Sequence, residues 1–356
     1  MNDRGNMLDI LDVMDPRGYI MHREIGNFLT QTNSIFEDAR WRPANNLSKH
    51  QMIITTKLPR VDLGQLNRGT LASKGARRKI EENSAIFESA ATVDKRLLRH
   101  AKTPENAIEY RMIEAYDHIE AMGQRAVESV FYGNIDQNPD DFLGLSNRYN
   151  RTTSGDFSKN VISNLPLNVN LETANTGMSI WLINWHDRGM FMFYPEGTAA
   201  GLRHEVFDND LRAEVDSNMD TRYRNTFVDL FEWNMGLAIH RWDAVARLCN
   251  IDRAVYNSPT LVGTETANNN RETNVRRLLD NMTRLYHRVN KMNGGKLCWY
   301  MNKSMKENLT VVARDLVRQG GGLTFGNYDN GEDLRYMGVP IREVDRLTDS
   351  EAQVAA

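Results

Sequence analysis

Histidines are the first residues to test for chemistry, because imidazole is a common zinc ligand and a common general base. The chain has eight, and no two stand at metal-ligand spacing on a predicted helix. His204-Glu205 lacks the second histidine of a zinc protease helix. The glycine-rich run Gly320–Gly326 follows a predicted helix and lacks the Gly-Lys-Ser/Thr of a phosphate-binding loop, so we interpret it as a helix end. We therefore expect neither a metal nor a cofactor.

Carboxylates and tryptophans offer a second kind of chemistry. Acidic residues between Glu205 and Asp220 alternate with apolar ones, as on the solvent side of a strand, although paired carboxylates there could act as an acid and a base. Trp181, Trp185 and Trp233 could stack on sugars or bases, but aromatic residues in predicted strands are more often part of a core. We expect no catalytic residue. A carbohydrate-active or hydrolytic enzyme, monomeric or a small oligomer, stays an alternative.

Composition excludes several classes of protein. Among 356 residues, 44 are Lys or Arg and 47 are Asp or Glu, so the net charge of −3 argues against a surface that binds nucleic acid throughout. No apolar run approaches the length of a membrane span, and the first residues lack the basic start and apolar segment of a secretory signal. Cys249 and Cys298 are far apart, so we expect two buried thiols in a reducing compartment.

The basic charge is concentrated between Lys49 and Lys102. This stretch holds twelve Lys or Arg against five Asp or Glu, a net charge of +7. A strand-like run from Met52 to Val61, a glycine-rich tip and a polar return from Arg77 to Thr92 predict a long hairpin. A ribbon with so few apolar residues is marginal by itself and needs a surface to lie on, unless the stretch is only a flexible surface loop. Residues 1–46 have no long periodic element, so we expect an arm that lies on a neighbour.

One long helix, predicted from Thr103 to Gly133, must position much of the rest. Thr103 suits an N-cap, Pro104 suits the first helical position, and Gly133 suits a left-handed end. At 1.5 Å per residue this helix is roughly 45 Å long, so an equally long element must lie against it. Its apolar residues follow steps of three and four: Ile108, Met112, Ala115 with Tyr116, Ile119, Met122, Ala126 and Val130.

Strands are predicted after this helix. Met178–Trp185 and Met190–Tyr194 are rich in aromatic and β-branched residues, and the four residues between them are typical of a hairpin loop. A second pair, about Arg203–Val215 and Tyr223–Met235, brackets a polar turn. We expect these four strands to form the long sheet on which the helix packs.

An α/β subdomain is predicted from Gly236 onward. Arg271–Met292 has helical periodicity and ends at Asn293-Gly294-Gly295, Lys296–Asn302 is a predicted strand, and Ser304 with Glu307 predicts a capping box for the next helix. The last strands are predicted between Tyr336 and Val344.

This order of elements resembles the major capsid protein of tailed double-stranded DNA bacteriophages, the Hong Kong 97-type fold, and most closely its podovirus-like members. The resemblance covers essentially the whole chain. The segments that carry it are Asp141–Tyr149, Tyr194–Thr198, Trp233–Leu237 leading to Asn250–Asp252, Cys298–Asn302 and Gly338–Asp345.

The resemblance implies an α+β fold whose segments have distinct roles. It implies an N-terminal arm at 1–46, an extended β-hairpin loop at 47–93, a peripheral domain at 94–235 with a spine helix at 103–133 and a long-stranded sheet, an α/β axial domain at 236–345 and a C-terminal tail at 346–356. It further implies self-assembly as hexamers and pentamers into an icosahedral shell around phage DNA, without enzymatic activity. We hypothesise that basic residues of the loop make the contacts between subunits. These residues are Lys57, Arg60, Arg68, Lys74, Arg77 and Arg78.

The resemblance also implies partners and a location. The protein would bind other copies of itself, a separate scaffolding protein, a portal protein and, in some relatives, a decoration protein; it would enclose double-stranded DNA without sequence-specific binding and would not bind a membrane. It would lie in the virion capsid after assembly in the host bacterial cytoplasm. Some relatives form covalent lysine to asparagine crosslinks from this loop, but no acceptor signature accompanies Lys74. An encapsulin-like nanocompartment, which shares the fold and encloses cargo protein in place of DNA, stays an alternative.

Overall fold

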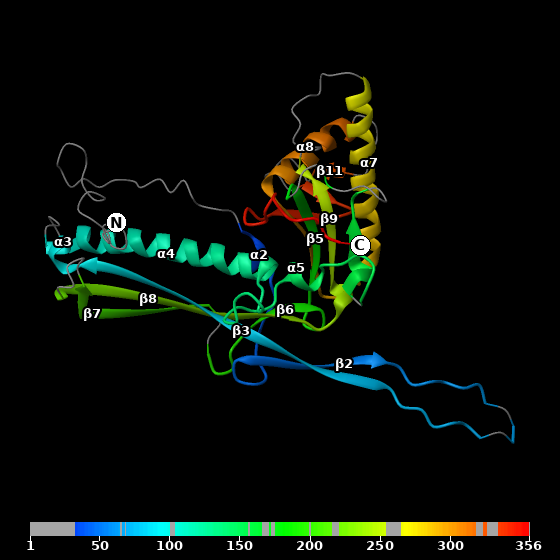
Figure 1. Cartoon of the computed structure of the whole chain (residues 1–356), viewed down its shortest axis with the longest axis horizontal. Coiled ribbons are helices and arrows are strands. Elements are labelled where there is room, and N and C mark those ends of the chain that lie inside the picture. Colours follow the sequence, from blue (N-terminus) through cyan, green and yellow to red (C-terminus); the bar gives the residue numbers. More distant parts are fainter. Residues whose placement is uncertain are drawn as a thin grey trace. The chain divides into compact units, whose positions relative to one another are not determined.

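The computed structural model describes residues 33–355 except 65, 68, 100–103, 156, 166–170, 172–174, 199–200, 216–220, 254–264, 318–322 and 326–333. It mixes helices and long strands (Figure 1), so the predicted α+β class is confirmed. The chain forms two compact units. Unit 1 contains Ile86–Val127 and Ala200–Asn234, and unit 2 contains Thr32–Ala85, Glu128–Ala199 and Met235–Ala356. Residues 128–199 cluster with the α/β region in unit 2.

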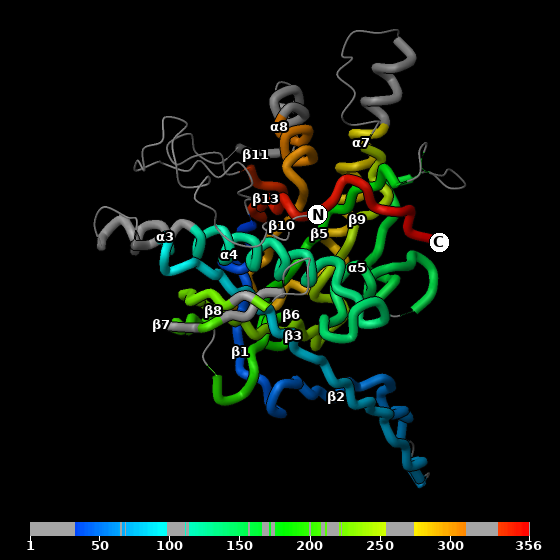
Figure 2. The backbone as a smooth tube through the Cα atoms, turned by 60° about the vertical axis from the view of Figure 1, so that its left-hand side comes forward, coloured from blue at the N-terminus to red at the C-terminus, as the bar shows by residue number. Residues whose placement is uncertain are grey.

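Unit 1 is built from long elements. Helix α4 (Pro104–Tyr132) runs beside strands β7 (Leu202–Val215) and β8 (Thr221–Ile239), as Figures 1 and 2 show. β7 and β8 pair antiparallel, which confirms the predicted hairpin. The end of β3 (Ala76–Asp94) and helix α3 (Lys95–Arg99) also belong to the described part of this unit.

The predicted long helix is confirmed, and its contacts show how it is held. Arg111 donates bidentate hydrogen bonds to Asp229 of β8, the shortest at 2.8 Å. Met122 and Ala126 are buried, whereas Tyr116 and Ile119 of the same predicted stripe are exposed. The apolar stripe is therefore covered only at the C-terminal end of its described part.

The role predicted for Gly133, a left-handed helix end, is wrong, because its φ angle is not positive. The helix instead ends where two chain segments meet. A Cβ atom on Gly133 would lie 2.4 Å from the carbonyl oxygen of Phe142 and 2.5 Å from that of Ser129. Glycine is required here for close approach, which lets the Gly144 amide donate to the Gly133 carbonyl at 2.8 Å.

Unit 2 is organised around β5 (Gly177–Trp185), whose nine residues are all buried. β5 pairs antiparallel with β9 (Val245–Asp252) on one side and β10 (Lys296–Met301) on the other. The sheet continues through short strands and is packed against helices α7 (Glu265–Arg288) and α8 (Lys303–Val317). These strands are β4 (Val161–Ser163) beyond β9, then β13 (Val339–Glu343), β12 (Leu334–Tyr336) and β11 (Leu323–Phe325) beyond β10.

The predicted hairpin between β5 and β6 (Met190–Tyr194) is wrong. The two strands pair only at Trp185 and Met190, and in parallel. β9 and β10 occupy both edges of β5, so no edge is left for a second antiparallel neighbour. β6 pairs instead with the end of β8 and with β1 (Trp41–Pro43). The four predicted strands lie in one larger sheet, in which β6 neighbours both β5 and β8, and β7 pairs with β8.

The last helix starts with a different cap from the predicted one. The Ser304 amide donates to the side-chain oxygen of Asn302 at 2.9 Å, and the amides of Met305 and Lys306 donate to the Asn302 carbonyl. Asn302 is therefore the N-cap, and Ser304 is already inside the helix. The turn after α7 contains Gly294 with φ of +80°, which agrees with the predicted stop.

Short elements complete unit 2. Helix α2 (Ile35–Asp38) and β1 lie at the start of the described chain. Helix α5 (Leu145–Arg148) and the 3-10 turns η2 (Phe157–Asn160) and η3 (Trp242–Ala244) connect the larger elements. β2 (Lys49–Lys57) pairs antiparallel with the first half of β3, which confirms the predicted ribbon within 47–93.

Candidate assembly surfaces

The hairpin of β2 and β3 exposes the basic residues that the sequence singled out. Lys57, Arg60, Lys74, Arg77 and Arg78 are all exposed, and Arg68 lies outside the described residues. Arg60 pairs with Asp62 at 2.6 Å. The other four make no ion pair among the residues that the structure describes. Arg77 stands opposite Thr55 and Arg78 opposite Ile54, so these neighbouring arginines lie on opposite faces of the ribbon.

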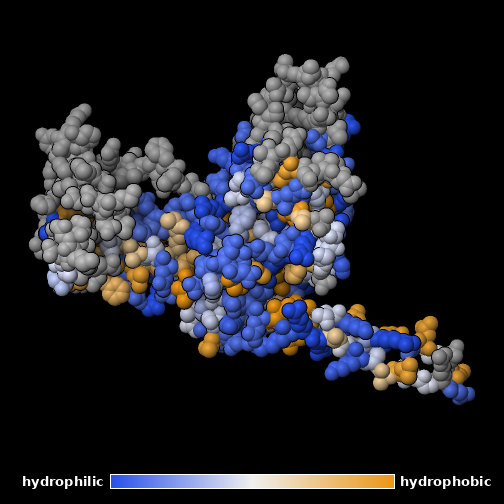
Figure 3. Space-filling model, viewed as in Figure 1, coloured by the Kyte–Doolittle hydropathy of each residue, from blue (hydrophilic) through white to orange (hydrophobic). Residues whose placement is uncertain are grey.

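The tip of the hairpin also carries apolar side chains, which sequence reasoning missed. Five of them are 70 to 98% exposed, and Figure 3 shows hydrophobic residues along the free end of the ribbon. Singly exposed apolar residues are ordinary, but a group on one protruding loop is typical of an interaction surface. The sequence signal that could have revealed this surface is a leucine or valine at every second to fifth position of the tip. The five residues are Leu58, Val61, Leu63, Leu66 and Leu71.

The base of the hairpin is fixed to the rest of unit 2 by apolar packing. Met52 is buried in a cluster with Phe191, Phe193 and Ala238. His50 contacts both phenylalanine rings, with ring centroids 5.2 and 5.6 Å away, and its burial lowers its pKa from 6.5. The ribbon therefore has a held end and a free end.

A buried ion pair holds the same base from the other strand. Glu82 accepts two hydrogen bonds from Arg148 of α5, both of 2.6 Å, and the two side chains are 9% and 7% exposed. Arg148 donates further to the Leu143 carbonyl at 3.1 Å. Paired charges with satisfied hydrogen bonds tolerate burial, but either alone would not.

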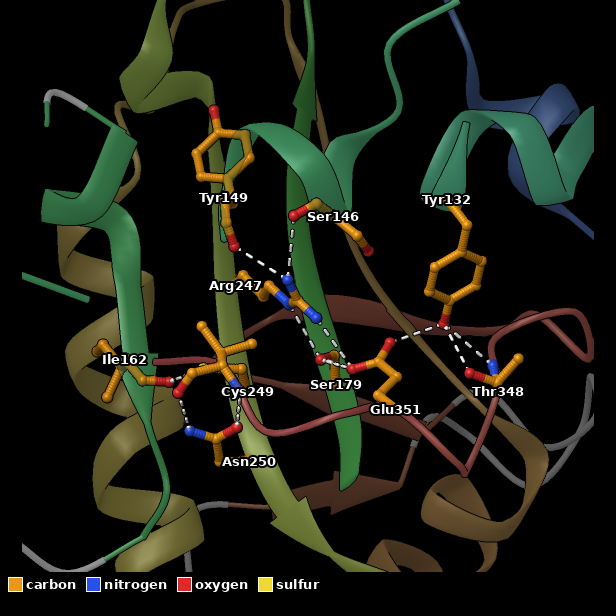
Figure 4. Close-up of polar contacts among 11 residues, drawn as sticks. Tyr132, Ser146, Tyr149, Ile162, Ser179, Arg247, Cys249, Asn250, Thr348 and Glu351 are labelled. Atoms are coloured by element: carbon orange, nitrogen blue, oxygen red, sulfur yellow. Dashed lines mark hydrogen bonds and ion pairs between the residues drawn. The ribbon is translucent and has the colours of Figure 1, made fainter. Parts of the chain in front are cut away.

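Residues 344–355 are held across unit 2 by a second buried network (Figure 4). Arg247 of β9 donates to Glu351 at 3.0 Å and to the Tyr149 carbonyl at 2.9 Å, and Ser179 also donates to Glu351. The side chains of Arg247 and Glu351 are 4% and 7% exposed. Tyr132 donates to the second Glu351 oxygen at 2.7 Å, so both carboxylate oxygens are paired.

Backbone contacts tie this segment down as well. Glu351 and Gly177 exchange two backbone hydrogen bonds of 2.8 and 3.1 Å, and a Cβ on Gly177 would lie 2.8 Å from the Glu351 carbonyl. Asn250, whose φ is +57°, uses its side-chain amide to pair with both backbone groups of Val354. We name residues 344–355 the clasp segment.

Residues 33–46 are anchored to unit 2 too. The Asp38 carboxylate pairs with Lys296 at 2.5 Å and accepts a hydrogen bond from Tyr300 at 2.9 Å. β1 adds a parallel strand to β6. The expectation that residues 1–46 find no partner within one copy is thus wrong for 33–46, while 1–32 lie outside the described residues.

Several residues that the sequence singled out for chemistry are buried. Trp181 and Trp185 are buried in the core, which removes them as a stacking surface. Cys249 and Cys298 are free and buried, and burial raises the pKa of their thiols to about 12 and about 11. No group of His, Cys, Asp or Glu among these residues could hold a metal ion. None of the described helices is both long and apolar enough to cross a membrane.

Comparison with known families decides the class of this chain. The family model for major capsid protein GP7 matches residues 15–355. The chain belongs to this family. It is therefore a phage major capsid protein, a structural component of a capsid. A search of curated proteins finds no match.

One solved structure shows the fold of this capsid protein. A chain in the structure of bacteriophage Epsilon15 is 21% identical, with a TM-score of 0.67 over 98% of each chain. This likeness confirms the expected Hong Kong 97-type fold. The bacteriophage JBD30 capsid gives 9% identity and a TM-score of 0.44 over 90% of this chain and 93% of that one. The SrpI encapsulin complex from Synechococcus elongatus PCC 7942 gives 13% and 0.40 over 65% and 92%.

Proposed function

We propose that this capsid protein assembles with itself as hexamers and pentamers into a closed icosahedral shell around phage double-stranded DNA. The observation that carries the proposal is the hairpin of β2 and β3. Its base is fixed by buried contacts, while its free end exposes basic and apolar side chains with nothing in the described chain to cover them. Burying apolar surface stabilises a contact by about 25 cal/mol per Å². In a shell made of identical chains, the surface that covers these side chains would belong to a second copy.

Two kinds of interaction would stabilise the contact between copies, apolar burial and charge pairing. The apolar tip residues supply area, and the basic residues supply charge complementarity to an acidic surface on the adjacent copy. We therefore keep Lys57, Arg60, Arg68, Lys74, Arg77 and Arg78 as the proposed intersubunit residues. Since Arg77 and Arg78 lie on opposite faces of the ribbon, the free end would meet acidic groups on both of its faces.

The finer assignments belong to the same proposal. We propose the arm at residues 1–46, the peripheral domain at about 94–235, the axial domain at 236–345 and the tail at 346–356. The ends of the axial domains would meet at the five-fold and six-fold axes of the shell. Scaffolding, portal and decoration proteins would bind the shell, and assembly would take place in the host bacterial cytoplasm. The shell would enclose the DNA without sequence-specific binding, as the resemblance to tailed-phage capsid proteins implies.

Replacing the four central basic residues tests the proposal. The fourfold serine variant of Arg68, Lys74, Arg77 and Arg78 should give folded chains that fail to form shells, as measured by sedimentation and negative-stain imaging. A matched variant with lysine at Arg68, Arg77 and Arg78 keeps the charge and should assemble. Normal particle yield from the serine variant would refute the role of these residues. Absence of nucleic acid from particles made during infection would refute the enclosure of DNA.

A further inference from the structure

β7 is an edge strand with unusual exposure. Among the described strands it pairs only with β8, so the backbone groups along its other edge are open over a strand of fourteen residues (Figure 1). Leu202, Val206, Phe207 and Leu211 are exposed along it. Long edges with exposed apolar side chains invite a further strand, and proteins normally blunt them.

The sequence of β7 is complementary to itself when the strand is reversed. With a centre between Asp208 and Asn209, residues at equal distances from that centre stand opposite each other in an antiparallel pair of two copies. Charges then meet opposite charges and apolar residues meet apolar residues. The pairs are Arg203 with Glu214, Glu205 with Arg212, Leu202 with Val215 and Val206 with Leu211.

Neighbouring registers lose this match. A shift of two residues in one direction places Arg203 opposite Arg212 of the other copy, and a shift in the other direction places Glu205 opposite Glu214. Like charges directly opposite each other destabilise a pair of strands. The charges therefore select one register.

The bulge in β7 makes this register possible. Phe207 stands opposite Val228 and Asp210 opposite Thr226, so β7 has one more residue than β8 between these positions. In a regular strand, Arg203 and Glu214 would fall on opposite faces because side chains alternate. With the extra residue, positions 203 and 214 stand opposite Glu232 and Arg222 of β8, ten residues apart, so the two positions have the same place in the alternation of the sheet, and the same holds for the other three pairs named above.

We infer that β7 pairs antiparallel with β7 of a second copy, about a two-fold axis that passes between Asp208 and Asn209. This inference rests on the proposed function. A two-fold contact is isologous, whereas the members of a closed ring of five or six copies meet through heterologous contacts. The β7 pair therefore joins one hexamer or pentamer to the next.

Charge reversal tests the pairing. Arg203→Glu places like charges opposite each other twice in each contact, so shell yield should fall at least roughly tenfold while rings persist. Glu214→Arg should do the same. Mixing the two variants restores every charge pair between unlike copies, and so should recover shells. Arg253→Glu, which breaks the exposed pair with Asp349 in unit 2, serves as the matched control and should assemble normally.

Cysteine crosslinking gives a second readout that does not depend on the charges. The double variant Val206→Cys/Leu211→Cys should form disulfide-linked pairs of chains in assembled particles under mild oxidation. Val206→Cys/Ala213→Cys, displaced by two residues, should not. Equal crosslinking of both variants, or none in either, would overturn the register.

The outcomes separate this inference from the proposed function. If the parent chain and Arg203→Glu both form shells, or if mixing fails to rescue, β7 does not pair in this way although the shell proposal stands. If the parent chain with its scaffold forms neither rings nor shells, the proposed function itself fails.

Discussion

Truncation of Arg148 is the sharpest test of how the hairpin is held. Arg148→Met keeps most of the side-chain volume but leaves the Glu82 carboxylate buried, without two hydrogen bonds of 2.6 Å. Both side chains are less than a tenth exposed, so water cannot replace the lost partner. Removing one member of such a pair costs about 3–5 kcal/mol of unfolding free energy. Total stabilities are typically only about 5–15 kcal/mol, so this loss is large.

The assay is urea unfolding of unassembled chains, with hydrogen exchange of the β2 amides as a local readout. Arg253→Met removes the arginine of an exposed ion pair with Asp349 at 2.8 Å and should cost under about 1 kcal/mol. Glu82→Gln combined with Arg148→Met should recover part of the loss, because no buried charge is then left unpaired. An Arg148→Met cost no larger than that of the Arg253 control would refute the argument.

Three further predictions concern buried groups of unit 2. Glu351→Gln removes the buried charge that pairs with an arginine and should cost about 3 kcal/mol in urea unfolding, with faster proteolysis of the clasp segment; an unchanged urea midpoint would contradict it. Burial lowers the pKa of His50 and of His240, so the unfolded chain binds protons more readily and the unfolding free energy should fall as pH drops through about 6.5. His50→Gln should flatten this slope in part, and an unchanged slope would count against His50. Alkylation of Cys249 and Cys298 at pH 8 should be at least roughly a hundredfold slower in folded than in unfolded chains, and equal rates would show that these thiols are accessible.

Local sequence signals predicted the elements whose ends and periodicity are encoded nearby. The helix at Pro104–Tyr132 and the β7–β8 hairpin were found from apolar steps and turn residues. The sequence also suggested that the hairpin at 47–93 needs an outside partner, because its composition cannot build a core.

Long-range pairing was not predictable from such signals. The four residues after Trp185 suit a tight turn, yet β5 cannot form a hairpin with β6 because strands from distant parts of the chain fill both of its edges. Gly133 is the residue type that favours a left-handed helix end, but the close approach of the Phe142 carbonyl decides its geometry. The Glu82–Arg148 pair likewise joins positions 66 residues apart.

Residues that stabilise a single chain differ from those proposed to contact other copies, because only the former are buried with polar partners in the same chain. The clasp segment and residues 33–46 are held in unit 2 by the buried carboxylates of Glu351 and Asp38, which pair with basic side chains and tyrosine hydroxyls, so a substitution there should unfold chains before it affects contacts between copies. The free end of the hairpin is exposed and contributes little to the stability of one chain. Substitutions at Leu63 or Lys74 should therefore leave the unfolding midpoint unchanged while they alter particle yield. A loss of stability of 2 kcal/mol or more from either, on the order of a buried apolar side chain, would show that the hairpin packs on its own chain and that the assignment of its free end to a neighbouring copy is wrong.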